Sequence, residues 1–90
     1  MKTILFYWSK GADIRRGIVK SIGECERKKK PCYLNLLAEK FGLSHVAIKK
    51  HLDLLREEGY VSELNPNGKP VYLSLSKKGI EVLAEFSDKK

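Results

Sequence analysis

Residues 36–61 read LLAEKFGLSHVAIKKHLDLLREEGYV, and this stretch decides the fold because it joins two helical patterns at a tight turn. The apolar residues of the first, short pattern are Leu36, Leu37, Ala38 and Phe41. Gly42 ends it, since glycine adopts the left-handed conformation after a helix at the lowest cost. Ser44 is a good N-cap for the second helix, which is predicted to be buried on one side only. That buried face, at about 100° per residue, consists of Ile48, Leu52 and Leu55.

A longer amphipathic helix is predicted before this stretch, over residues 12–27. Its apolar positions recur at helical spacing and are Ile14, Ile18, Ile22 and Cys25. Its predicted outer face carries Arg15, Arg16, Lys20 and Glu24. Pro31 prevents a helix from continuing, so residues 32–34 are expected to be extended, and Asn35 is expected to cap the helix that follows.

After Gly59 the apolar residues alternate with polar ones, which is typical of strands. The alternating apolar positions are Val61, Val71, Leu73 and Leu75. They flank residues 65–70, NPNGKP, which are dense in turn formers, so a β-hairpin is predicted. Ser76 then caps a last helix with the apolar residues Ile80, Val82, Leu83, Ala84 and Phe86. One buried stripe needs fewer apolar residues, so a second contact surface is expected on this helix.

The order helix, short strand, helix, glycine turn, helix, hairpin, helix resembles a known family. Residues 36–61, together with VYLSLSKKG at residues 71–79, are similar to the winged helix-turn-helix module of small prokaryotic transcription regulators of the ArsR and MarR type, archaeal ones included. The resemblance covers residues 12–86 and implies an α+β winged-helix fold. Residues 12–90 are accordingly expected to form a DNA-binding domain, with residues 1–11 as an apolar N-terminal segment outside it.

The charge favours a polyanionic partner. Eighteen Lys and Arg residues against eleven Asp and Glu residues give a net charge of +7 in 90 residues. The excess lies early in the chain, because residues 1–32 carry nine basic and three acidic side chains, whereas residues 33–59 carry four of each. Double-stranded DNA is the leading partner, ahead of an anionic membrane surface or a lysine-rich surface that serves solubility alone.

The candidate DNA-contacting residues follow from this resemblance and from the geometry of a helix in a major groove. The start of the recognition helix supplies Ser44, His45, Val46, Ala47, Lys49 and Lys50. A lysine can contact guanine or phosphate and small apolar side chains can pack on thymine methyl groups. The wing tip supplies Asn67, Gly68 and Lys69, for which the resemblance implies minor-groove or phosphate contact. Arg15 and Arg16 either widen the phosphate contact or form a solvated face, and Asp53, Glu57 and Glu58 restrict the approach to the first two turns of the helix.

The N-terminal run ILFYW at residues 4–8 is too apolar to be exposed to water. With the surplus face of the last helix it predicts a homodimer interface formed by Leu5, Phe6, Trp8, Val82 and Phe86. Such a homodimer would place two recognition helices about 34–36 Å apart on one face of a duplex. The alternative is that these residues cover the core of their own domain.

The sequence favours no catalytic activity, cofactor or metal site. It has no glycine-rich phosphate loop and no recognisable catalytic triad. Cys25 and Cys32 are either free thiols or a disulfide within or between chains, and no ligand-spaced cluster lies near them. The longest apolar run is shorter than a membrane span or a secretory signal, so a cytoplasmic protein is expected, and the Lys- and Glu-rich, Gln-free composition leans toward a thermophilic source.

The overall prediction is a homodimeric transcription regulator that binds specific sequences in double-stranded DNA. The alternatives are a winged-helix protein-interaction module and a non-specific architectural DNA binder. The sequence identifies no effector.

Overall fold

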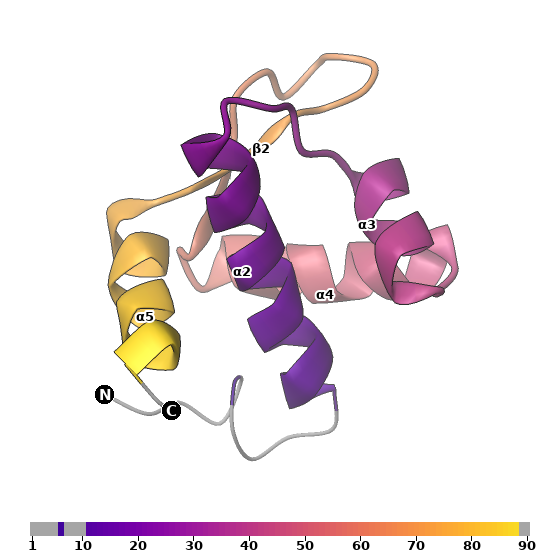
Figure 1. The fold of residues 1–90 in the computed structure, drawn as a ribbon. Helices are drawn as coiled ribbons and strands as arrows, with labels where there is room; N and C mark the ends of the chain where they lie inside the picture. The colour runs from indigo at the N-terminus through magenta and orange to yellow at the C-terminus, as the bar shows by residue number, and fades with distance from the viewer. Residues whose placement is uncertain (1–5, 7–10, 89–90) are drawn as a thin grey trace.

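The computed structural model describes Phe6 and residues 11–88, and this part of the chain consists of helices and a two-stranded antiparallel sheet whose connecting loop projects from the helices (Figure 1). In chain order the elements are α2 (Ala12–Arg27), α3 (Leu34–Phe41), α4 (His45–Glu57), β1 (Val61–Glu63), β2 (Leu73–Leu75) and α5 (Lys77–Asp88). This order and the hairpin confirm the predicted α+β winged helix. None of the described helices is both long and apolar enough to cross a bilayer.

Helix α2 is the centre of the molecule and contacts α3, α4, β2 and α5. In Figure 1 it runs between α5 on one side and α3 on the other. Its buried apolar side chains include Ile18, Val19 and Ile22, each with no exposed surface. The predicted bounds of this helix, residues 12–27, are confirmed.

The turn between α3 and α4 has the predicted form. Gly42 takes the left-handed conformation, with φ 65°, at the end of α3. The Ser44 hydroxyl accepts a hydrogen bond from the Ala47 amide at 3.1 Å and so caps α4. Ile48 and Leu55 are fully buried, which orients the opposite face of α4 outward.

The predicted cap of α3 is wrong by two residues. Tyr33 is the N-cap, and Asn35 lies exposed within the first turn of the helix. The reason is a long-range pairing, because Tyr33 forms an antiparallel bridge with Tyr72 of the wing and is held extended there. The helix therefore starts directly after the bridge, and Leu34, which was predicted to be extended, is helical.

The wing is a short hairpin with a third, minimal strand at its edge. Val61 pairs with Leu75, and Glu63 pairs with Leu73. The Leu73 amide donates to the Cys32 carbonyl at 2.8 Å on the other side of β2. Asn65 holds the loop together, because its side-chain oxygen accepts from the Tyr72 amide at 2.7 Å. Strand β2 is thus hydrogen-bonded to β1 on one side and to the segment before α3 on the other.

The core corrects the predicted dimer interface. Phe6 has no exposed surface, and Val82 and Phe86 are each 6% exposed. The Phe6 ring packs edge-on against Phe86, with centroids 5.2 Å apart, and against Tyr60 at 4.9 Å. Helix α5 packs on α2 and, through Phe86, on Phe6. These three side chains therefore serve the core of their own chain, while Leu5 and Trp8 lie outside the described residues.

Candidate nucleic-acid interface

The first two turns of α4 present a side-chain surface to solvent. Five of the six predicted contact residues here are exposed: Ser44, His45, Val46, Lys49 and Lys50. Ala47 is half-buried. Val46 is 67% exposed, although it is apolar. An exposed apolar side chain beside two lysines fits a surface that contacts a partner with both apolar and anionic groups.

Lys50 stands on the side of α4 opposite the core. It follows the fully buried Ile48 by two residues, which at about 100° per residue is a rotation of about 200°. Lys50 forms no ion pair with any residue of the described part of the chain. Its ammonium group is therefore available to a partner without breaking an internal interaction.

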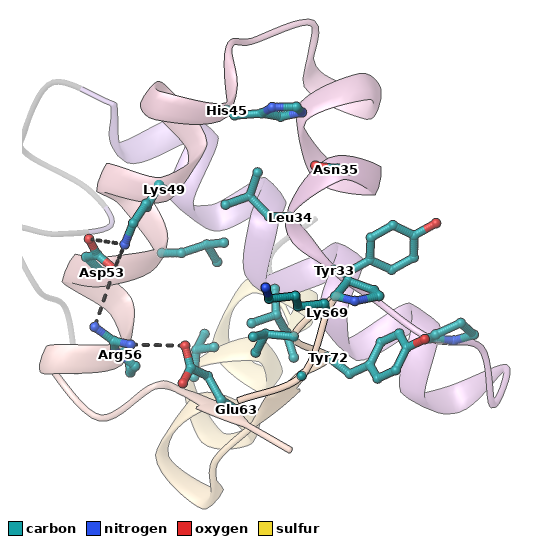
Figure 2. Close-up of a pocket in the computed structure, with 17 residues that line it drawn as sticks. Tyr33, Leu34, Asn35, His45, Lys49, Asp53, Arg56, Glu63, Lys69 and Tyr72 are labelled. Carbon is teal, nitrogen blue, oxygen red and sulfur yellow. Dashed lines mark hydrogen bonds and ion pairs between the residues drawn. The ribbon is translucent and has the colours of Figure 1, made fainter. Parts of the chain in front are cut away.

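A groove of about 860 Å³ lies between α4 and the wing (Figure 2). His45 and Lys49 line it from α4, and Gly68 and Lys69 line it from the wing. The structure thus brings together two sets of residues that the sequence places about twenty positions apart. Asn67 is exposed at the tip of the same wing loop.

Two tyrosines that were not predicted as site residues also line this groove. Tyr33 and Tyr72 pack edge-to-face, with ring centroids 6.1 Å apart, although they lie far apart in the sequence. The bridge between their backbones places them there. The sequence near Tyr33 does not reveal that it lines a groove, because its pairing with Tyr72 joins segments that are far apart in the chain.

A chain of ion pairs ties α4 to the wing along one wall of the groove. The Lys49 ammonium lies 3.2 Å from the Asp53 carboxylate, and the Arg56 guanidinium lies 3.4 Å from Asp53 and 3.0 Å from Glu63. Figure 2 shows these four side chains linked in sequence. The negative charge of Asp53 is therefore balanced within the chain, and Glu63 of β1 is held against the last turn of α4.

The prediction that Arg15 lies on an exposed face is wrong. Arg15 is 3% exposed, and its guanidinium contacts Nδ1 of His51 at 3.1 Å. The physical reason is helical spacing, since Arg15 precedes Val19 and Ile22 by four and seven residues and shares their buried face. Burial lowers the pKa of the Arg15 guanidinium from its usual value. His51 is half-buried against it.

Arg16 is engaged inside the chain as well. Its guanidinium donates to the Asp13 carboxylate and to the Phe6 carbonyl. These contacts hold Phe6 to the start of α2. We therefore assign neither arginine to the candidate interface, which consists of the start of α4 and the tip of the wing.

Metal-ligating side chains do not gather at the candidate interface among the residues that the structure describes. No group of three or more His, Cys, Asp or Glu side chains in this part of the chain is placed to hold a metal ion. Cys25 and Cys32 are both free thiols.

Comparison with known proteins finds the same fold in solved structures. No protein-family model and no curated protein sequence matches the chain. Among solved structures, a cysteine-to-serine mutant of MarR from E. coli in complex with operator DNA superposes with a TM-score of 0.64 and 23% identity, over 79% of this chain and 49% of that one. The transcriptional regulator BldR from Sulfolobus solfataricus superposes with a TM-score of 0.71 and 23% identity, over 90% of this chain and 56% of that one.

A third structure, ZitR from Lactococcus lactis, gives a TM-score of 0.69 and 22% identity over 83% of this chain and 55% of that one. The chain thus spans about half the length of the solved structures it matches. The predicted resemblance is confirmed at the level of the fold, and the chain has the winged-helix fold of these regulators.

Proposed function

We propose that this chain binds double-stranded DNA and acts as a transcription regulator, with α4 in the major groove and the wing on the adjacent backbone or minor groove. The observation that carries the proposal is that the exposed start of α4 and the tip of the wing line the same groove. His45 and Lys49 line this groove from α4, whereas the exposed Val46 and Lys50 lie outside its lining, on the outward face of the same helix. The operator complex of the similar MarR structure supports the same partner.

Dimensions and charge fit this assignment. A major groove about 12 Å wide accepts one helix, and the first residues of a recognition helix reach the base edges. Lys50 and Val46 are in our proposal the base-contacting residues, because both are exposed and each lies two positions from the buried Ile48, on the opposite face of α4. Ser44 and His45 stand at the N-terminus of α4, where free backbone amides favour a phosphate.

The wing and the ion pairs define how far the contact extends. Lys69 and Asn67 are exposed at the wing tip and reach the phosphate backbone in this arrangement. Lys49 is shared with Asp53, so it contributes less net attraction than Lys50. The exposed Glu57 and Glu58 end α4 with negative charge, which restricts the approach to the first two turns.

We further propose a homodimer, because two copies would place their recognition helices on successive turns of one duplex face. Leu5 and Trp8 remain the proposed contact, whereas Phe6, Val82 and Phe86 are buried within the chain. Analytical ultracentrifugation with and without a duplex tests the stoichiometry, and a single copy per duplex at saturation contradicts the proposal.

Fluorescence anisotropy with two alanine variants tests the interface. Lys50→Ala should weaken binding and relax the preference at one base position, because a base-edge contact is typically worth about 1–3 kcal/mol. Lys69→Ala should weaken binding to all sequences alike and reduce the slope of log K against log salt by roughly one. Lys20→Ala on α2, which removes an exposed lysine outside the groove, is the control. Equal, sequence-independent losses from both variants would exclude base reading by Lys50.

A protein-interaction module is the second candidate. It is favoured by the balanced charge of residues 33–59 and by the internal pairing of Lys49 and Arg56. A helix surface that carries little net charge suits a protein partner better than a phosphate backbone. Absence of DNA binding at the lowest salt concentration would favour this candidate.

A further inference from the structure

Cys25 and Cys32 meet at the end of the molecule that carries the wing. Cys25 lies in the last turn of α2, and Cys32 lies in the segment that precedes α3. Cys32 is 2% exposed and belongs to the hydrophobic core, and the half-buried Cys25 packs against the same cluster. The intervening loop folds back on the helix, because the Lys30 amide donates to the Cys25 carbonyl at 2.8 Å.

The two thiols differ in reactivity. Burial, and then the neighbouring Cys25 thiol, raise the pKa of Cys32 to about 12. Since the thiolate is the reactive form, Cys32 is a poor nucleophile toward oxidants in solution. Cys25 is the more exposed of the two, so a reagent meets it first.

We propose that Cys25 and Cys32 are an oxidisable pair that forms an intramolecular disulfide with a small disulfide oxidant such as oxidised glutathione. The Cys25 thiolate attacks one sulfur of glutathione disulfide, which gives a mixed disulfide and releases one glutathione thiolate. Cys32 then loses its proton to that thiolate or to solvent and attacks the Cys25 sulfur. The second glutathione leaves, so that two protein thiols are oxidised to one disulfide while one glutathione disulfide is reduced to two glutathione molecules.

The bond would connect α2 to the base of the wing. The Cys32 carbonyl accepts from the Leu73 amide at 2.8 Å, and the next residue, Tyr33, pairs with Tyr72. A disulfide at Cys32 therefore joins the central helix covalently to the strand that borders β2. It closes a loop of only eight residues, which reduces the entropy of the unfolded chain.

The experiment compares the folded protein after incubation with glutathione disulfide and after full reduction. Intact mass should fall by the mass of two hydrogen atoms in the oxidised sample, and a tryptic map should contain residue 25 linked to residue 32. Far-UV circular dichroism should show a melting temperature higher by roughly 10–20 °C in the oxidised form, given the loop size and the length of the chain. Added reductant should reverse the shift.

Variants separate the steps. Cys32→Ala keeps an apolar side chain in the core and should stop at a stable glutathione adduct on Cys25. Cys25→Ser should remain unmodified while folded, because Cys32 is buried. The proposal is overturned if oxidation yields disulfide-linked dimers, if both thiols of the folded wild type stay free, or if the intramolecular bond lowers the melting temperature.

Discussion

The buried contact between Arg15 and His51 joins the central helix to the recognition helix through two side chains. An arginine guanidinium can only donate hydrogen bonds, so Nδ1 of His51 accepts and the ring proton resides on Nε2. Burial, and then the charge of Arg15, lower the pKa of His51. The neutral imidazole is therefore the form that the fold requires at this position.

Stability should consequently depend on pH below neutrality. The unfolded chain binds a proton at His51 near the usual pKa of about 6.5, whereas the folded chain resists it, so the His51 contribution is fully present above that pH and is lost as pH falls toward the lower folded pKa. We expect the melting temperature to fall between pH 7.5 and pH 5, as measured by circular dichroism.

Two histidine variants isolate this effect. His51→Gln should lower the melting temperature at pH 7.5 and flatten the pH dependence. His45→Gln changes an exposed histidine and should leave the wild-type slope intact. An unchanged slope in His51→Gln would show that other groups cause the pH dependence.

At the scale of elements, the N-cap of α4 links stability to the candidate interface. The Ser44 hydroxyl satisfies the Ala47 amide at the end of the helix that carries Val46 and Lys50. Ser44→Ala should cost about 1 kcal/mol of unfolding free energy, measured by urea denaturation. Fraying of the first turn should also weaken DNA binding.

Ser62→Ala is the matched control, because Ser62 is an exposed serine of β1 that caps no helix. It should change the unfolding free energy by less than about 0.5 kcal/mol. Equal effects of the two substitutions would contradict the capping role of Ser44.

The elements themselves could be predicted because their signals are local. The buried face of α4, the left-handed Gly42 and the Ser44 cap all follow from spacing and residue type. The position of Asn35 could not be predicted, because the start of α3 is fixed by the pairing of Tyr33 with the distant Tyr72. That same pairing places both tyrosines in the groove, which is why the sequence missed them as site residues.

Arg15 shows a second limit. An arginine within an amphipathic pattern is assigned by its residue type to the outer face, although its spacing from Val19 and Ile22 places it inside. Its burial depends on a partner, His51, on another helix. Helical spacing is sufficient to place Arg15 on the buried face, but it does not identify His51, the partner that contacts the buried guanidinium.

For the whole molecule, the sequence pattern could not decide whether the apolar N-terminal residues pack in the core or in a dimer interface, because both bury apolar side chains. The structure places Phe6 in the core, because its ring packs against both Tyr60 and Phe86. Charge at this scale is also uneven, because residues 33–59, which contain α3 and α4, are balanced and the excess lies in residues 1–32. The proposed DNA binding would therefore depend on a few exposed lysines more than on an overall basic surface.

Truncation of Phe6 should destabilise the fold itself. Phe6→Ala should cost about 3–5 kcal/mol of unfolding free energy, because a fully buried ring leaves a cavity. Ile80→Ala, at a side chain that is 55% exposed, should cost far less. If urea denaturation showed no loss for Phe6→Ala while the oligomeric state changed, the core assignment of Phe6 would be wrong.

The measurement that tests the central claim most directly is an anisotropy titration of the wild-type chain with two labelled duplexes across about 50–200 mM salt. One duplex carries the region upstream of its own gene, and the other carries the same bases in scrambled order. We predict tight binding to the first duplex, weaker binding to the second, and a steep loss of affinity with salt. No binding to either duplex at the lowest salt concentration would contradict the assignment of α4 and the wing as a DNA-binding surface.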